Sequence, residues 1–258
     1  MKILVLLKEV PVVNDIHIDR TTLTVDRSGA GNMMNPADRH AIEAAVAAAE
    51  AAGGEVAAMT MGRESSESLL KEAIGMGCKT AVRITDNAFA GADTLVTAQV
   101  IKAAADKIGP FDCIFCGSSS IDGETGQIPG KLAAMFGFGL LTRACSVETS
   151  AEGITIERKA GGGYEKLSAS FPLVCSVTED ANTPRNIGLK GRTAMKRAKI
   201  EVLTNEELGL SGQELVSHSK VTGLVPPPAA EVGCMLTGAD DIESAGNLVQ
   251  TLISKHLV

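Results

Sequence analysis

Residues 117–130, with the sequence GSSSIDGETGQIPG, are rich in glycine, serine and threonine. This run directly follows an apolar stretch that predicts a buried strand, and it leads into a segment that predicts a helix. Small residues let backbone N–H groups approach a phosphate closely, and the start of a helix adds partial positive charge. The sequence therefore predicts a nucleotide-phosphate site here, with a tight structural turn as the alternative.

Two acidic residues within this run, Asp122 and Glu124, would repel a phosphate. We therefore expect Asp122 to accept a hydrogen bond from a ribose hydroxyl or to hold the loop. The run does not match the P-loop motif, which would need Gly at position 125 and Ser or Thr at position 132, where the chain has Thr125 and Leu132. A glycine fingerprint for a dinucleotide is also missing after the first predicted strand.

Cys113 and Cys116 have the CxxC spacing of a redox or metal motif. The surrounding residues predict a buried strand, and residues three apart on a strand point to opposite faces. We therefore expect the two thiols to diverge and to pack as structural residues. The four histidines are far apart in the sequence, so we predict no catalytic residue and no metal site.

The composition limits the classes of partner. The chain has 258 residues, of which 24 are basic, 31 are acidic and only 3% are aromatic, so we expect no nucleic-acid partner. The net charge of −7 and the absence of a long apolar stretch argue against direct membrane insertion. Six cysteines scattered through apolar segments favour free thiols in the cytoplasm.

Strand and helix patterns alternate up to about residue 140, which predicts an α/β fold with an open parallel sheet and helices on both faces. Asn35 and Pro36 predict the start of the first helix, because Asn can cap free N–H groups and Pro fits the first helical position. That helix should end at Gly53. The remaining predicted strands and helices span residues 2–7, 55–61, 65–76, 79–84, 92–108, 112–116, 127–136 and 173–177.

Three further segments add to this core. Residues 154–158 and 165–170 alternate around a glycine turn and predict an antiparallel hairpin, and a smaller hairpin is expected over residues 16–25. Three prolines at 226–228 predict an extended spacer before a final helix at residues 242–256. The alternating core and these segments together predict two parts. The first is a nucleotide-binding domain over residues 1–200, with hairpin 150–172 and loop 179–199, and the second is a C-terminal arm over residues 201–258.

A set of short motifs occurs in order within residues 1–200. They are Lys8-Glu9-Val10-Pro11, the NPxDxxAxExA pattern from Asn35, Met61-Gly62, the 117–130 run, Gly162-Gly163-Tyr164-Glu165, Phe171-Pro172-Leu173-Val174 and the NxPR pattern from Asn182. In this order the motifs resemble those of the beta subunit of electron transfer flavoproteins. The resemblance implies an adenine-nucleotide-binding, Rossmann-like fold with a C-terminal arm that embraces an alpha subunit.

The resemblance also implies which residues would bind the nucleotide. These are Leu6, Asn35, Pro36, Ala37, Asp38, Met61, Asp93, Thr94, Gly117, Ser118, Ser119, Ser120, Ile121, Asp122, Gly123, Glu124, Thr125, Gly126, Gln127 and Ile128.

Two branches of the family differ in the cofactor at this site. One holds AMP, and its single flavin lies mainly in the alpha subunit. The other holds a second FAD, which accepts a hydride from NADH and bifurcates the electrons. Residues 89–94 and the small residues of the 117–130 run look like the two-flavin branch, so FAD is expected here rather than AMP, with another FAD in the alpha subunit.

The resemblance implies an electron carrier rather than a stand-alone enzyme. It would shuttle electrons between a flavin dehydrogenase, of the acyl-CoA type or another, and an acceptor. Pro184, Arg185 and Leu189 would dock that partner, and the nearby basic residues from Lys190 to Lys199 form either part of this surface or a solvated face. The alternative is a self-contained regulatory module that binds an adenine nucleotide.

Overall fold

The computed structural model describes residues 1–12, 17–19, 24–26, 31–219, 222–223 and 233–258. The chain divides into two compact units, Met1–Thr222 and Gly223–Val258. Among the described residues, no helix combines the length and the apolar character that crossing a bilayer requires.

The first unit is built on a seven-stranded sheet with the order β14-β7-β6-β1-β8-β13-β9. Every neighbouring pair is parallel, which confirms the predicted α/β class. The strands are β1 (Lys2–Leu7), β6 (Glu55–Met61), β7 (Thr80–Ile84), β8 (Cys113–Gly117), β9 (Gly139–Ala144), β13 (Leu173–Val177) and β14 (Glu201–Leu203).

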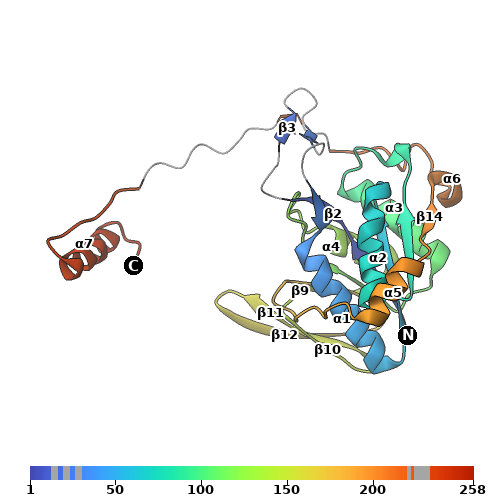
Figure 1. Ribbon diagram of the computed structural model, residues 1–258, viewed down its shortest axis with the longest axis horizontal. Helices are drawn as coiled ribbons and strands as arrows, with labels where there is room; N and C mark the ends of the chain where they lie inside the picture. Colours follow the sequence, from blue (N-terminus) through green and yellow to red (C-terminus); the bar gives the residue numbers. More distant parts are fainter. Residues whose placement is uncertain (13–16, 20–23, 27–30, 220–221, 224–232) are drawn as a thin grey trace. The chain divides into compact units, whose positions relative to one another are not determined.

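Helices lie on both faces of this sheet (Figure 1). They are α1 (Pro36–Ala52), α2 (Glu67–Met76), α3 (Thr94–Ile108), α4 (Ile128–Phe136), α5 (Leu189–Arg197) and α6 (Asn205–Leu208), with short 3-10 turns at Glu64–Ser66 and Asn87–Phe89. Gly53 ends α1 in the left-handed conformation, with φ of 66°, as predicted.

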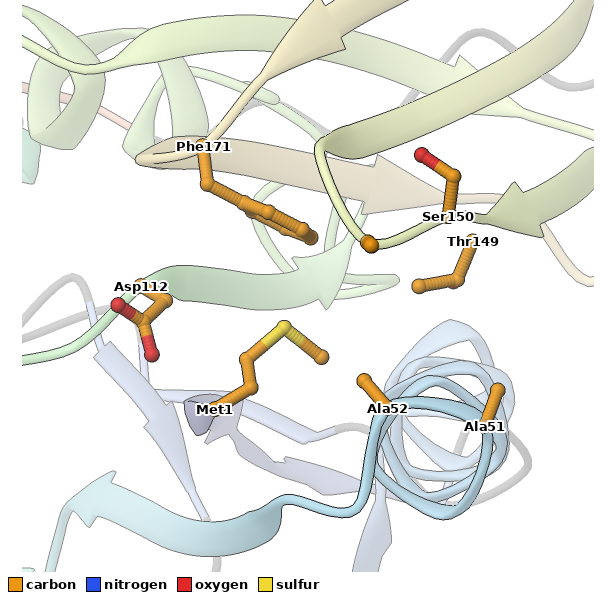
Figure 2. Close-up of a pocket in the computed structure, with 8 residues that line it drawn as sticks. Met1, Ala51, Ala52, Asp112, Thr149, Ser150 and Phe171 are labelled. Carbon is orange, nitrogen blue, oxygen red and sulfur yellow. The ribbon is translucent and has the colours of Figure 1, made fainter.

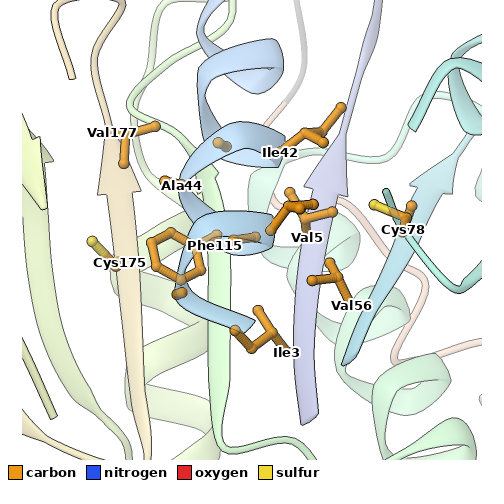
Figure 3. Close-up of a cluster of buried hydrophobic side chains, with 14 of the residues drawn as sticks. Ile3, Val5, Ile42, Ala44, Val56, Cys78, Phe115, Cys175 and Val177 are labelled. Atoms are coloured by element: carbon orange, nitrogen blue, oxygen red, sulfur yellow. The ribbon is translucent and has the colours of Figure 1, made fainter. Parts of the chain in front are cut away.

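Side chains alternate between the two faces of the central strand. Ile3 and Val5 pack into one core with α1 and α2, whereas Leu4 and Leu6 pack into the other with α3 and α4. Figure 3 shows the first core, where Phe115 lies under α1. Burial on both faces is the reason that the strands read as continuous apolar runs rather than as alternating patterns.

Strand order reverses at β1. The chain passes from β1 to β6 and β7 on one side, and then places β8 on the other side of β1. In open α/β sheets, ligands bind beyond the carboxyl ends of the strands at such a switch point. The sheet order therefore directs attention to the ends of β1 and β8.

A separate antiparallel sheet contains β10 (Ser146–Thr149), β11 (Gly153–Ala160) and β12 (Gly163–Ser170). It confirms the predicted hairpin, which turns at Gly161 and Gly162 with φ of 53° and 91°. Two short pairs precede α1: β2 (Glu9–Pro11) with β5 (Asn32–Met34), and β3 (His17–Asp19) with β4 (Thr24–Asp26). The rest of the small hairpin predicted at residues 16–25 lies outside the described residues.

Two strands of the large sheet do not appear in the sequence prediction. β9 pairs with β13, and β14 pairs with β7 in the part of the chain that was assigned to the arm. The sheet therefore continues past residue 200. The second unit contains α7 (Asp241–Ser254), which begins where the Asp240 side chain accepts from Glu243 N and which covers most of the predicted final helix. The proline spacer at 226–228 lies outside the described residues.

Candidate functional site

A cavity of about 330 Å³ lies at the switch point, between the carboxyl ends of β1 and β8 and the starts of α3 and α4. It is lined by Leu6, Leu7, Lys8, Asn35, Asp38, Met61, Ala92, Asp93, Thr94, Thr97, Ile101, Cys116, Gly117, Ser118, Ser119, Ser120, Gly123, Thr125, Gly126, Gln127, Ile128 and Pro129. Most of the residues that the sequence assigned to nucleotide binding meet here. Five of those residues do not line the cavity, namely Pro36, Ala37, Ile121, Asp122 and Glu124.

Asn35 does not cap α1, which corrects the sequence prediction. Its Nδ2 donates to Asp38 Oδ1 and to the carbonyl oxygen of Ser119, each at 2.9 Å, and its Oδ1 accepts from Ile121 N at 3.2 Å. The side chain therefore contacts Asp38 of α1 and the 117–130 run, instead of accepting from the first N–H groups of the helix. It fixes this run against the start of α1.

Asp38 joins three elements at the base of the cavity. Its Oδ2 accepts from Lys8 N at 2.7 Å, and its Oδ1 accepts from Gly117 N at 3.1 Å as well as from Asn35. Burial raises the pKa of Asp38 to about 7, against these hydrogen bonds, which lower it. A Cβ at Gly117 would collide with Asp38 Oδ1, so glycine is required where β8 ends.

Lys8 and Asp122 form an ion pair beside the cavity. Lys8 Nζ lies 2.7 Å from Asp122 Oδ1 and 3.1 Å from Ser120 Oγ. Burial alone would raise the pKa of Asp122, but the hydrogen bonds from Lys8 and Ser120 and the lysine charge hold it below its usual value. Of the two roles expected for Asp122, the contacts within the chain match that of holding the loop.

Asp93 caps α3 and also holds a distant segment. Its Oδ1 accepts from Leu95 N and Val96 N, and its Oδ2 accepts from His218 N and Ser219 N, all within 3.2 Å. These backbone hydrogen bonds, that of Val96 foremost, lower the pKa of Asp93. Both carboxylate oxygens are therefore engaged within the chain, and so are the N–H groups that donate to them.

The starts of α3 and α4 differ in whether their first backbone N–H groups are already hydrogen-bonded to a side chain. The first N–H groups of α3 are taken up by Asp93, whereas among the described residues no side chain caps the start of α4 after Gln127. Thr94 Oγ1 donates to Gln127 Oε1 at 2.7 Å and ties the two helix starts together. The uncapped start of α4, the adjacent glycines and Lys8 give this cavity the properties of an anion site.

The predicted docking residues lie elsewhere, before and at the start of α5. Arg185 is paired within the chain, because its guanidinium contacts Glu43 and Glu50 of α1 at distances of 2.7–3.1 Å. The hydrogen bonds that Arg185 donates to the carboxylates of Glu50 and Glu43 raise the pKa of Arg185. Pro184 is half-buried, whereas Leu189 is 83% exposed, so of the three residues Leu189 alone presents a large free apolar surface.

A second hollow lies at the opposite, amino end of the sheet (Figure 2). It has a volume of about 630 Å³ and is lined by Met1, Ala51, Ala52, Asp112, Thr149, Ser150, Ala151 and Phe171. The lining includes the last residues of α1, where the helix dipole is negative, and a carboxylate. This hollow does not have the features of an anion site.

A family model described as the electron transfer flavoprotein domain matches residues 22–208. The chain belongs to the electron transfer flavoprotein family. The beta subunit of the electron transfer flavoprotein of Thermoanaerobacterium thermosaccharolyticum is 35% identical over 262 residues, with 100% of each chain covered. The family resemblance seen in the sequence is thereby confirmed, and the chain is a beta-type subunit that acts in electron transfer.

Two other relatives are named as parts of larger systems. The "Caffeyl-CoA reductase-Etf complex subunit CarD" of Acetobacterium woodii is 32% identical over 262 residues, and 100% of each chain is covered. The "Acryloyl-CoA reductase electron transfer subunit gamma" of Anaerotignum propionicum is 31% identical over 272 residues, again with 100% of each chain covered.

Seven residues that line the cavity were not among the predicted site residues, namely Leu7, Lys8, Ala92, Thr97, Ile101, Cys116 and Pro129. Lys8 stands in the first family motif, but its partner Asp122 is 114 positions away, so their ion pair carries no local signal. The segment Ser217–Ser219 follows a region without regular pattern, and nothing in the sequence indicated its contact with Asp93.

Proposed function

We propose that this chain binds an adenine nucleotide in the switch-point cavity and works with an alpha subunit as an electron transfer flavoprotein. The observation that carries the proposal is the meeting, at one sheet edge, of two helix starts, a glycine-rich turn and Lys8. Membership of a flavoprotein family supplies the class of ligand. The bound flavins would supply the redox chemistry, and the protein would bind and orient them.

The residues around the cavity fit such a group. The uncapped start of α4 and the small residues Gly123 and Gly126 offer backbone N–H groups to a phosphate. Leu6, Met61 and Ile101 offer apolar contacts to a base. These contributions are binding and orientation, and no proton transfer by a side chain is needed.

FAD remains the first candidate for this site, and AMP is the second. A volume of about 330 Å³ lies at the lower end of the range for ligand pockets, so the chain itself would enclose the adenylate part. Oxidation of NADH is proposed only for the FAD case.

The partners are proposed from the relatives. An alpha subunit follows from the similarity to beta subunits over the whole chain, and a flavin-dependent acyl-CoA dehydrogenase or reductase follows from the two relatives named for CoA reductases. The free surface of Leu189 is proposed to meet that enzyme, while Arg185 stabilises the segment before it through Glu43 and Glu50.

The experiment is a cofactor count on the complex. The chain is co-expressed with an electron transfer flavoprotein alpha subunit from the same organism, and the nucleotides released from the purified complex are separated and quantified. Two FAD per heterodimer are expected. One FAD and one AMP would assign AMP to the cavity and remove NADH oxidation from the proposal. A complex with a single FAD and no other adenine nucleotide would contradict nucleotide binding by this chain.

A further inference from the structure

The charges around the cavity present a problem for an anionic ligand. Asp38 and Asp93 line it, and Asp122 lies beside it on the loop. Lys8 is the only lysine or arginine among the described lining residues. A bound phosphate would therefore meet three carboxylates and one cation, and the question is how each carboxylate is neutralised.

Two of the three carboxylates are stabilised by hydrogen bonds from amide donors. Asp38 accepts from two backbone N–H groups and the Asn35 amide, and Asp93 accepts from four backbone N–H groups. These donors belong to the fixed frame of the site, so neither carboxylate needs a side-chain cation.

Asp122 is different because its main partner is a lysine from another element. The Asp122 side chain is only 13% exposed, whereas that of Lys8 is 48% exposed. Lys8 follows the last residue of β1, and Asp122 stands in the loop that follows β8, so the pair joins the two strands at the switch point. Without Lys8, a largely buried carboxylate would remain without a cation next to the proposed phosphate position.

We propose that Lys8 is a positioning residue, which neutralises Asp122 and holds the loop after β8 at the cavity instead of binding the phosphate itself. The phosphate would then be bound by backbone N–H groups at the start of α4. This inference rests on the proposed function, because it assigns a role within the same nucleotide site. In this proposal Lys8 pairs with Asp122 on the loop and does not contact the ligand.

A double-mutant cycle tests the proposal on the complex with the alpha subunit, stripped of nucleotide and titrated with AMP and with FAD. Lys8→Met is expected to weaken binding about tenfold, equivalent to about 1.4 kcal/mol. Asp122→Asn keeps an oxygen that can accept from Lys8, so binding should stay within about twofold of wild type. The double variant should recover to within about threefold of wild type, because the uncompensated charge is gone.

The contrary outcomes are distinct. If the double variant binds as weakly as Lys8→Met, the lysine contacts the phosphate and the proposal is overturned. If Asp122→Asn alone weakens binding tenfold, Asp122 contacts the ligand and the proposal is equally overturned. Lys8→Arg keeps the positive charge, so it should bind nucleotide about as tightly as wild type. Lys79→Met removes the same charge just before β7, at the amino end of the sheet, and should leave affinity unchanged.

A ligand-free measurement separates this proposal from the proposed function. In the nucleotide-free complex, Lys8→Met should speed hydrogen exchange in the peptide covering residues 118–127, where Ile121 N and Glu124 N are hydrogen-bonded, and Lys79→Met should not. Unchanged exchange would overturn the role of Lys8. Faster exchange, in a protein whose wild type binds neither AMP nor FAD, would support that role and refute nucleotide binding.

Discussion

The two ends of the seven-stranded sheet are both hollowed, but they present opposite ends of helices. The amino end has the larger hollow, about 630 Å³, and it presents the end of α1 and the Asp112 carboxylate. The carboxyl end has a cavity of about 330 Å³, and it presents two helix starts, Lys8, and three carboxylates that are each hydrogen-bonded within the chain. Backbone polarity, rather than volume, thus distinguishes the candidate anion site from a surface hollow.

The largest expected effect of a single change is at Gly117, where β8 ends. In Gly117→Val the new Cβ would collide with Asp38 Oδ1 and press on Ala37. We expect a loss of at least about 2 kcal/mol in the free energy of unfolding and loss of nucleotide binding. Denaturant unfolding and nucleotide titration measure the two effects.

The matched control for this change is Gly123→Ala in the same loop. A Cβ there has Ser120 Oγ at 3.8 Å as its only close neighbour, so stability should change little. Equal damage from the two variants would contradict the claim that the end of β8 requires glycine.

The second expected effect is a pH dependence of stability, caused by Asp38 at the carboxyl end of the sheet. Burial raises the pKa of Asp38 from 3.8 to about 7. Between about pH 4 and pH 7 the folded carboxyl retains a proton that the unfolded chain has released, so stability falls as pH rises through this window. The expected fall is a few kcal/mol, at about 1.4 kcal/mol per unit of pKa difference.

Asp38→Asn should abolish this part of the pH dependence of unfolding, measured by denaturant titration from pH 4 to pH 8. The exposed Asp106→Asn is the control and should retain the wild-type slope. An unchanged slope in Asp38→Asn would show that another group causes it.

A smaller effect is expected at the amino end. Asp112 Oδ2 accepts from Lys2 N at 2.7 Å, so Asp112→Asn should cost about 1 kcal/mol of stability. Nucleotide affinity should remain within about twofold of wild type, because the change lies at the other end of the sheet. If Asp112→Asn folds normally but loses much of its nucleotide affinity, the ligand binds at the amino end of the sheet, which would contradict the proposed site.

The smallest expected effect concerns the link between the two helix starts. Thr94→Val removes the hydrogen bond to Gln127 Oε1. Since such a bond contributes about 0.5–1 kcal/mol, the variant should bind nucleotide about threefold more weakly. Thr193→Val, which removes a hydrogen bond to Leu189 O on α5, should not change nucleotide affinity. Calorimetric titration of both variants resolves the difference.

Local patterns were sufficient for most of the fold. Continuous apolar runs predicted five strands of the large sheet, and the reasoning on Cys113 and Cys116 is confirmed, because the two residues pack into opposite cores. β14 was missed since it has three residues, of which only Leu203 is buried. β9 was missed since it is an edge strand with two buried residues, Leu141 and Ala144.

The site was predictable in its position more than in its contacts. The 117–130 run indicated the loop, and Asn35 and Asp38 came from the family motif. Which donor meets which acceptor depended on pairs far apart in sequence, such as Lys8 with Asp122 or Asp93 with His218. The predicted cap at Asn35 was wrong for the same reason, because a distant loop competes for its side chain.

The central claim is that an adenine nucleotide binds at the carboxyl end of the sheet. Hydrogen exchange of the complex with its alpha subunit, compared with and without nucleotide, tests it most directly. We predict slower exchange in residues 117–128 and 92–97 and no change in residues 51–54 and 149–151. Slower exchange confined to the amino end, or no change at the carboxyl end with nucleotide bound, would contradict the account.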